Sequence, residues 1–456
     1  MTSNAAASPA TKAPQRGSSA GSSARLYVWV WLPGATDPVP AGAIEPTGAS
    51  LEGEPVIAFT YARSYRERKD AIALFPPELP LGTGTINPTR PGVAVRDLRG
   101  QPWLGLPRPQ DRSAVPLAGC LRDAAPDAWG RRVINLRLAA DPEAYLTEMT
   151  YLQSSSSDRI GALDFQSSPS TYEPRGESAT LEQLINAAAL VEAGEPIPEE
   201  LAAAAGHGTS IGGARPKAIL SDDGPGVIAK FSSSTDTRPV VKAEAVGMLL
   251  AGRVGIEVPR VQIVHAAGKD VLLVDRFDRT ANGGRRLMVS ALTILGLRAH
   301  EARYAGYPDL VQSIRSAGWS DVRSQLQELY TRMVVNIAIS NTDDHLRNHA
   351  AFWDGQSLRL TPAYDVSPQP RSTQVATHAI ALTARGNKYS QFWVAKEAAV
   401  DFGLTTAQGQ EVIDHVVESI HASWAEVCDE AHLTRAERDQ LWGREILNPY
   451  ASYPES

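Results

Sequence analysis

The segment SNTDDHLRNHAAF, residues 340–352, concentrates side chains that can bind metals or transfer protons. It contains two adjacent carboxylates, Asp343 and Asp344, followed by His345, Asn348 and His349. Three interpretations fit this composition: a metal cluster, a solvated turn or a catalytic loop. The sequence on either side has to distinguish between them.

A zinc site would need His and Cys ligands at short helical or knuckle spacing. His345 and His349 are four residues apart, but the apolar helical pattern ends before them and no third soft ligand is evident. The two cysteines, Cys120 and Cys428, are far apart and have no ligand spacing. The sequence therefore argues against metal-hydrolase chemistry and against a disulfide framework, and it fits a reducing cytoplasm.

The flanking sequence predicts a buried helix before the polar segment and a hairpin after it. Apolar residues recur at helical spacing over 325–340. AAFW and SLRL then flank DGQ, which is a hairpin pattern, and the chain reaches Asp365 within TPAYDVSP. The order is helix, polar loop, hairpin and a further aspartate.

Protein kinases use an Asp followed five positions later by an Asn, and a further Asp after a short hairpin to hold magnesium. Asp343 and Asn348 have this separation, and Asp365 follows the predicted hairpin. Asp344 lacks the required spacing to Asn348. We therefore assign Asp343 as the general base and predict a structural or loop-ordering role for Asp344.

A lysine and a glutamate upstream match the same pattern. AIL and GVIAKF flank SDDGPG and predict a hairpin with Lys230 near its end, and a helix with Glu244 follows over 240–259, stopped by Gly255. Kinases use such a pair to place the lysine against nucleotide phosphates. An ordinary surface lysine and glutamate remain the alternative.

The segment SIGGARPK, residues 210–217, has two adjacent glycines and a lysine, so its backbone N–H groups could approach an anion. Its spacing matches neither the Walker P-loop nor GxGxxG. A flexible turn is the alternative for this segment.

The length and composition of the chain predict a globular protein of several substructures, whose helices and strands must position these residues. The chain has 456 residues, of which 43% are hydrophobic and 21% charged. Its net charge of −7 argues against broad nucleic-acid binding by this chain alone. No apolar run reaches the length of about 18 residues that a membrane span needs, and residues 1–24 lack the apolar core of a secretory signal.

Strands are expected over 25–34, 53–62 and 159–165, with helices after Pro126 and over 180–193.

The combined motifs resemble those of the HipA family of bacterial serine/threonine kinases, the toxins of type II toxin–antitoxin modules. The resemblance covers about residues 25 to 440, and the catalytic-loop and PAYD motifs are its most specific part. The motifs are SIGGARPK, IAKF, the helix with Glu244, VDRFDR (274–279), NTDDHLRN and PAYDVSP, together with LRDAAPDAWGRR (121–132) and DRIGAL (158–163) in the N-terminal region.

The resemblance implies an α+β, bilobal protein-kinase-like fold with a β-containing N-terminal lobe and a mostly helical C-terminal lobe. It also implies a division of the chain into four parts. These are an N-terminal tail (1–24), a β-rich N-terminal subdomain (25–165), a kinase N-lobe portion with the phosphate loop (166–285) and a helical C-lobe with the catalytic loop (286–450).

For the site, the resemblance implies that ATP and Mg²⁺ are the cofactors. Asp343 is the implied base, Asn348 and Asp365 the implied Mg²⁺ ligands, and Ser210 the serine that family members autophosphorylate, which expels the loop and silences the kinase. A turn-capping role is the alternative for Ser210. The implied nucleotide-binding residues are Gly212, Gly213, Ala214, Arg215, Pro216, Lys217, Lys230, Asp275, Arg276, Phe277, His345, Leu346, Arg347, Asn348, Tyr364 and Asp365.

One departure is Arg347, where the family usually has lysine; the charge is kept but the donor geometry changes. By resemblance the function is a serine/threonine kinase toxin that phosphorylates a translation component such as an aminoacyl-tRNA synthetase. Its implied partner is a helix-turn-helix antitoxin of the HipB type, with DNA contacted only through that antitoxin. A co-repressor in which catalysis is secondary, and a small-molecule kinase, are the alternatives.

Overall fold

The computed structural model describes most of the chain between residues 25 and 454. Segment 1–24, expected to be a tail, and the predicted phosphate-loop residues Gly212 and Ala214 lie outside the described residues. The described ranges are 25–49, 55–88, 116–176, 179–210, 213, 215–220, 225–233, 236–316, 318–371 and 373–454.

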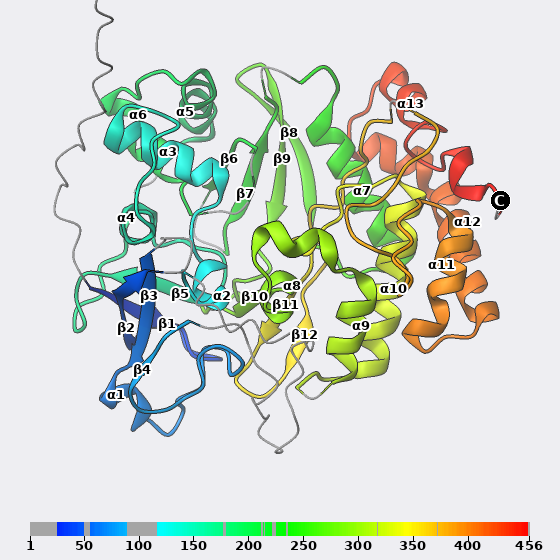
Figure 1. The fold of residues 1–456 in the computed structure, drawn as a ribbon. Coiled ribbons are helices and arrows are strands. Elements are labelled where there is room, and N and C mark those ends of the chain that lie inside the picture. The colour runs from blue at the N-terminus through cyan, green and yellow to red at the C-terminus, as the bar shows by residue number, and fades with distance from the viewer. Residues whose placement is uncertain are drawn as a thin grey trace, which may run out of the picture.

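The N-terminal part of the chain forms an antiparallel five-stranded sheet with strand order β4-β3-β2-β1-β5, at the lower left of Figure 1. Strand β1 pairs with both of its neighbours, β2 and β5, since Val28 lies opposite Gly42 on one side and Phe165 on the other. The three strands predicted in this region are therefore confirmed. The elements are β1 Leu26–Val30, β2 Val39–Ala49, β3 Pro55–Tyr61, β4 Thr85–Ile86 and β5 Leu163–Gln166, with the short helices α1 Arg63–Arg66 and α2 Gly119–Arg122.

A second, four-stranded sheet has the order β6-β7-β9-β8 and contains the predicted hairpin, because β6 pairs with β7. Side chains alternate between the two faces of a strand. Ala229 and Phe231 pack on the face covered by α3, α5 and α6, while Leu272 and Val274 pack in the same core as α7. The elements are β6 Lys217–Leu220, β7 Val227–Phe231, β8 Val261–Ala266, β9 Lys269–Asp275, α3 Ala128–Ala139, α4 Glu148–Ser154, α5 Leu181–Ala193, α6 Glu199–Gly206 and α7 Val240–Val254.

The C-terminal half is mostly helical and lies to the right in Figure 1. The helix predicted over 325–340 is confirmed as α10, Val322–Ala338, and the hairpin after the polar loop is confirmed as β11 and β12. The long helix α12 contacts both α10 and α7. The remaining elements are β10 Leu287–Ser290, β11 Ala350–Trp353, β12 Leu358–Leu360, α8 Ala291–Ile294, η1 Ala299–Tyr304, α9 Tyr307–Arg315, α11 Phe392–Ala398, η2 Ala399–Phe402, α12 Thr406–Glu430, α13 Arg435–Leu441 and η3 Pro449–Ser452.

The hydrophobic cores cross the boundaries that the sequence suggested between parts of the chain. Trp129 of α3 packs with the four-stranded sheet. A three-stranded sheet has the order β10-β11-β12, and its residues Leu287 and Trp353 pack with the N-terminal sheet. The predicted division at residues 165 and 285 therefore stays a prediction, while the mixed α+β architecture is confirmed. Among the described residues, no helix combines the length and the apolar character needed to cross a bilayer.

Candidate active site

Lys230 lies at the centre of the candidate active site, between two carboxylates from different parts of the chain. Its Nζ atom is 2.5 Å from Oε1 of Glu244 on α7 and 2.6 Å from Oδ1 of Asp365, which follows the β11–β12 hairpin. A close backbone approach makes this meeting possible. A Cβ atom at Gly247 would lie 2.2 Å from the carbonyl oxygen of Val366, so only glycine lets α7 lie against the segment that carries Asp365.

The charges of these three groups support one another. Burial opposes protonation of Lys230, but Asp365 and Glu244 together raise the pKa of its ammonium group above the usual value. Lys230 in turn holds the pKa of Asp365 well below its usual range, against the effect of burial. Burial raises the pKa of Glu244, and Lys230 opposes that rise. Lys230 is therefore a fixed cation beside the ionised, half-exposed carboxylate of Asp365.

A second lysine lies directly beside the first. Lys217 of β6 is the cross-strand partner of Lys230 in β7, so both side chains project from the same face of the sheet. Burial and the neighbouring charge of Lys230 lower the pKa of Lys217 to about 8. We call the segment 210–217 the glycine loop. The Lys217 ammonium group lies against Gly213 of this loop, because a Cβ atom at Gly213 would be 2.1 Å from the Lys217 Nζ atom. Two adjacent cations and a glycine backbone form a site suited to a polyanion.

The glycine loop is held by the start of α3, which the sequence did not single out as part of the site. The backbone N–H of Gly213 donates to Oδ2 of Asp127 at 2.8 Å, and the N–H of Trp129 donates to the Gly213 carbonyl at 3.2 Å. The Trp129 indole also donates to the Lys217 carbonyl at 3.1 Å. The signal that could have found these residues is the APDAWGRR segment, whose Asp precedes a helix start.

The catalytic-loop candidate begins where α10 ends. Asp343 is exposed, whereas its neighbour Asp344 is 1% exposed. Partial burial raises the pKa of Asp343, His345 lowers it, and Asp365 and Asp344 raise it further. An exposed carboxylate with a raised pKa is a suitable proton acceptor.

Tyr364 joins the catalytic loop to the segment after β9. Its hydroxyl donates to the Arg347 carbonyl at 2.6 Å, and its ring lies 5.7 Å from that of Phe277, centroid to centroid. The Phe277 ring also contacts that of Phe352 at 6.1 Å. These aromatic rings form an apolar surface at the predicted adenine side, where a base could stack.

Several predicted site residues have side chains engaged elsewhere. The Leu346 side chain is buried in the hydrophobic core shared by α7, α10 and α12, and the Arg276 guanidinium bonds to Asp278 and Asp158. Arg215 pairs with Asp236 at 2.9 Å. Of the other predicted residues, Asp275 and Arg347 are exposed and Pro216 is buried. His345 is half-buried, and its Nδ1 atom has no hydrogen-bond partner in the described part of the chain. The Leu346 and Arg276 side chains are therefore not available to contact a nucleotide, and the Arg276 backbone N–H donates to the Gly226 carbonyl at 3.2 Å.

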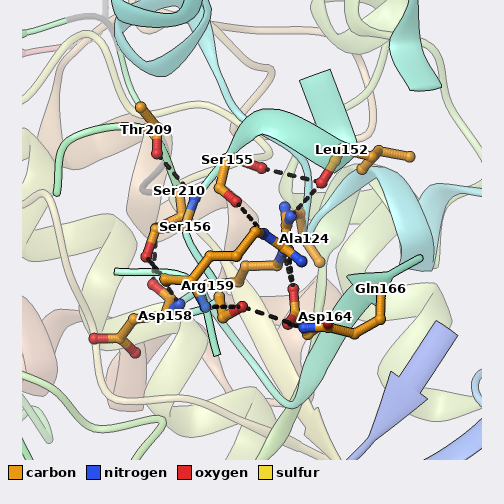
Figure 2. A network of polar contacts seen from close by, with 12 residues as sticks. Ala124, Leu152, Ser155, Ser156, Asp158, Arg159, Asp164, Gln166, Thr209 and Ser210 are labelled. Carbon is orange, nitrogen blue, oxygen red and sulfur yellow. Dashed lines mark hydrogen bonds and ion pairs between the residues drawn. The ribbon is translucent and has the colours of Figure 1, made fainter. Parts of the chain in front are cut away.

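Ser210 lies in a buried seam between the glycine loop and the N-terminal part of the chain (Figure 2). It is 2% exposed, and its hydroxyl donates to the carbonyl of Asp158 at 2.8 Å. The adjacent Thr209 hydroxyl accepts from the N–H of Ser156 at 3.0 Å. Phosphorylation of Ser210 would therefore require this segment to leave the seam.

The segment that holds Ser210 is itself fixed by buried charges, visible at the centre of Figure 2. Arg159 is fully buried and donates to Asp164 at 2.8 Å and to the carbonyls of Ala124 and Leu152. The Asp158 carboxylate accepts from Arg279 at 2.6 Å. Asp158 thus links the segment after β9 to Ser210, because its carboxylate accepts from Arg279 and its carbonyl accepts from the Ser210 hydroxyl.

The donor set fits magnesium better than a softer metal. No group of three or more His, Cys, Asp or Glu side chains suited to a metal occurs among the residues described. Asn348 and Asp365 would supply one amide oxygen and one carboxylate, and Mg²⁺ is usually held by one or two such groups together with substrate phosphates. Asp365 adopts a left-handed backbone conformation with φ of 59°, which turns this residue out of the extended chain.

Comparisons with known proteins find a matching family model and a similar curated protein. The family model described as the HipA-like C-terminal domain matches residues 209–424. A protein of Sinorhizobium fredii (strain NBRC 101917 / NGR234) called "Putative kinase Y4mE" is 24% identical over 208 residues, which are 42% of this chain and 48% of that protein. The match thus spans about half the length of that relative.

Solved structures extend the similarity to nearly the whole chain. HipA in the complex of the Shewanella oneidensis MR-1 toxin–antitoxin system, which also contains HipB and operator DNA, aligns with a TM-score of 0.59 and 17% identity. That alignment covers 94% of this chain and 100% of that one. The Helicobacter pylori proinflammatory kinase CtkA aligns with a TM-score of 0.35 and 14% identity over 50% of this chain and 93% of that chain. The chain therefore matches the HipA-like C-terminal domain over residues 209–424 and has the protein-kinase-like fold of HipA.

Proposed function

We propose that this protein is an ATP-dependent serine/threonine kinase and the toxin of a HipBA-type toxin–antitoxin module. One observation carries the proposal: Lys230 bonds at the same time to Glu244 and to Asp365. This arrangement places a fixed cation where kinases hold nucleotide phosphates. The carboxylate of Asp365 is at the same time kept ionised for a metal.

The proposed mechanism is one of positioning and charge stabilisation. Lys230 and Lys217 bind the phosphates of ATP, and the backbone of the glycine loop covers them. Asn348 and Asp365 would hold Mg²⁺, which would supply charge neutralisation on the transferring phosphoryl group. Asp343 accepts the proton of the substrate hydroxyl as that oxygen attacks the γ-phosphorus of ATP, and the bond from this phosphorus to the bridging oxygen breaks to release ADP. The Phe277 and Tyr364 rings contact the adenine.

The proposed substrate is a translation component such as an aminoacyl-tRNA synthetase, and the proposed partner is a HipB-like antitoxin. A HipA–HipB–DNA complex is the structural neighbour that supports this partner. The test is transfer of labelled phosphate from ATP in a cell lysate, with the labelled protein identified by mass spectrometry. A co-repressor would bind ATP and antitoxin without labelling any protein, and a small-molecule kinase would label only the small-molecule fraction.

Incubation with ATP and Mg²⁺ is expected to place one phosphate on Ser210. The added charge of about −1.5 to −2 cannot return to the seam, where the Ser210 hydroxyl now faces the carbonyl of Asp158. Activity should therefore fall as the modification accumulates, which intact-mass and peptide mass spectrometry would follow. The Ser210→Ala variant should stay unmodified and keep its activity. A fully active preparation in which Ser210 remains unmodified after many turnovers would contradict this role.

ATP affinity is expected to weaken as the pH rises through about 8, because Lys217 has its pKa there. Phosphates favour the protonated ammonium group, so ATP should raise this pKa and binding should take up protons above pH 8. Titration calorimetry in buffers of different ionisation enthalpy measures that uptake. In Lys217→Arg the pH dependence should disappear, since arginine stays protonated over this range. An unchanged pH profile in that variant would assign the dependence to another group.

A further inference from the structure

Five polar side chains are buried together beneath the candidate catalytic loop, although none of them is needed to bind ATP. Each is less than 5% exposed. They come from the start of α9, from α10 and from the loop itself. The five residues are Tyr307, Asn336, Asn341, Asp344 and His349.

Asp344 is the centre of this cluster, and both of its carboxylate oxygens are engaged. The Tyr307 hydroxyl donates to Oδ2 at 2.5 Å, and Nε2 of His349 lies 2.9 Å from Oδ1. The Tyr307 and His349 rings also contact each other edge to face, with centroids 5.4 Å apart. A buried carboxylate is costly unless it is hydrogen-bonded, so the hydrogen bond from Tyr307 fixes the position of Asp344, and the His349 ring lies close beside it.

The cluster continues into the helix that delivers the loop. Asn336 of α10 donates its side-chain amide to the Tyr307 hydroxyl at 3.1 Å. Asn341 donates to Asn336 twice, from its side chain at 3.0 Å and from its backbone N–H at 2.8 Å. The Tyr307 hydroxyl therefore links the end of α10, the loop and α9 through hydrogen bonds alone.

Two members of the cluster, Asp344 and His349, are sequence neighbours of the proposed functional residues. Asp344 follows Asp343, the proposed base, and His349 follows Asn348, a proposed Mg²⁺ ligand. The His349 carbonyl also accepts from the N–H of Ala291 at 2.8 Å, which anchors that end of the loop to α8. Both functional residues thus sit one bond away from a buried, fixed neighbour.

We propose that Tyr307, Asp344 and His349 form a positioning unit, the Asp344 strut, that fixes Asp343 and Asn348 for phosphoryl transfer. This inference rests on the proposed kinase function and adds positioning residues to it. Misplacement of a reacting group by about 1 Å can cost about 10²-fold in rate. Loss of the strut should therefore lower kcat, while phosphate binding by Lys230 and Lys217, on the other lobe, stays intact.

Tyr307→Phe is the sharpest test, since it removes one hydroxyl and keeps the ring. We expect kcat to fall by roughly 10- to 100-fold and the Mg²⁺ concentration for half-maximal activity to rise, with little change in the KM for ATP. Asp344→Asn, which keeps the shape but removes the charge, should show the same pattern. If Tyr307→Phe does not fold, Asp344→Asn carries the test.

Tyr330→Phe is the matched control. Tyr330 is also fully buried in this lobe and donates its hydroxyl to a carbonyl, that of Ala395 at 3.0 Å, but it does not touch the catalytic loop. Its loss should lower the melting temperature by a similar amount and leave kcat and the Mg²⁺ requirement unchanged. Equal kinetic losses in both variants would show a general stability effect and overturn the strut.

Hydrogen exchange supplies a readout that does not depend on kinase activity. In Tyr307→Phe, amides of residues 341–349 should exchange faster than in the wild type, and in Tyr330→Phe they should not. Unchanged exchange in this segment would overturn the proposal whether or not the wild type transfers phosphate. A wild type that transfers none, with exchange altered only in Tyr307→Phe, would keep the strut and reject the proposed kinase function.

Discussion

Replacing Asp343 by asparagine is expected to slow phosphoryl transfer by about 10²–10⁴-fold, the usual contribution of a general base. Asparagine keeps the size of the side chain but cannot accept a proton as a carboxylate does. The exposed position of Asp343 indicates that the fold will tolerate the change. The rate should be measured as labelled-phosphate transfer at saturating ATP.

ATP binding is the internal check on that experiment. The affinity of Asp343→Asn for ATP should stay close to that of the wild type, because Lys230 and Lys217 are unchanged. Asp414→Asn is a matched control, since Asp414 is an exposed aspartate on α12 that accepts from Gln410 at 2.9 Å. Near wild-type transfer by Asp343→Asn would remove this residue from the role of base.

Replacing Lys230 by methionine is expected to lower phosphoryl transfer by about 10²–10³-fold, as loss of one preorganised charge typically does. The variant should also bind ATP more weakly. A second effect follows from the two ion pairs of Lys230, because Glu244 and Asp365 both lose their cation. The melting temperature should therefore fall as well, by less than for a fully buried pair, since the Asp365 side chain is 48% exposed.

A further substitution separates these two effects of Lys230→Met. Adding Glu244→Gln removes the more buried of the two carboxylates that Lys230→Met leaves without a cation. The double variant should therefore regain melting temperature without regaining activity. Lys242→Met is the matched control on α7: the Lys242 side chain is 9% exposed, against 16% for Lys230, and pairs with Asp270 at 3.1 Å and Glu437 at 3.5 Å, away from the site. If Lys230→Met retained wild-type activity and Lys242→Met lost it, the site would be misassigned.

The local part of the site could be predicted from the sequence because it depends on short-range patterns. Helical periodicity followed by a polar loop and a hairpin fixes the order of α10, the catalytic loop and β11–β12. The separation of Asp343 from Asn348 is a matter of counting residues. The Lys230 strand and the Glu244 helix were predicted in the same way, and the structure brings their side chains into contact.

Other features could not be predicted, because they join segments with no common pattern. Asp127 binds the N–H of Gly213, 86 residues further along the chain. Lys217 was expected in the phosphate loop, but its pairing with Lys230 depends on the register of β6 and β7. The burial of Ser210 depends on how the seam around Asp158 packs, which composition does not encode.

By itself the sequence determined the residues able to carry the chemistry, since periodicity and spacing are properties of neighbouring residues, and its resemblance to a known family implied the fold class. Only the tertiary structure decided how they are held. Asp344 shows the difference, because its spacing gave it no more than a supporting role. Its contact with Tyr307, 37 residues away, is made by the packing of α9 against α10. A buried charge is fixed by the partners that packing brings to it, and those partners cannot be read from a linear pattern.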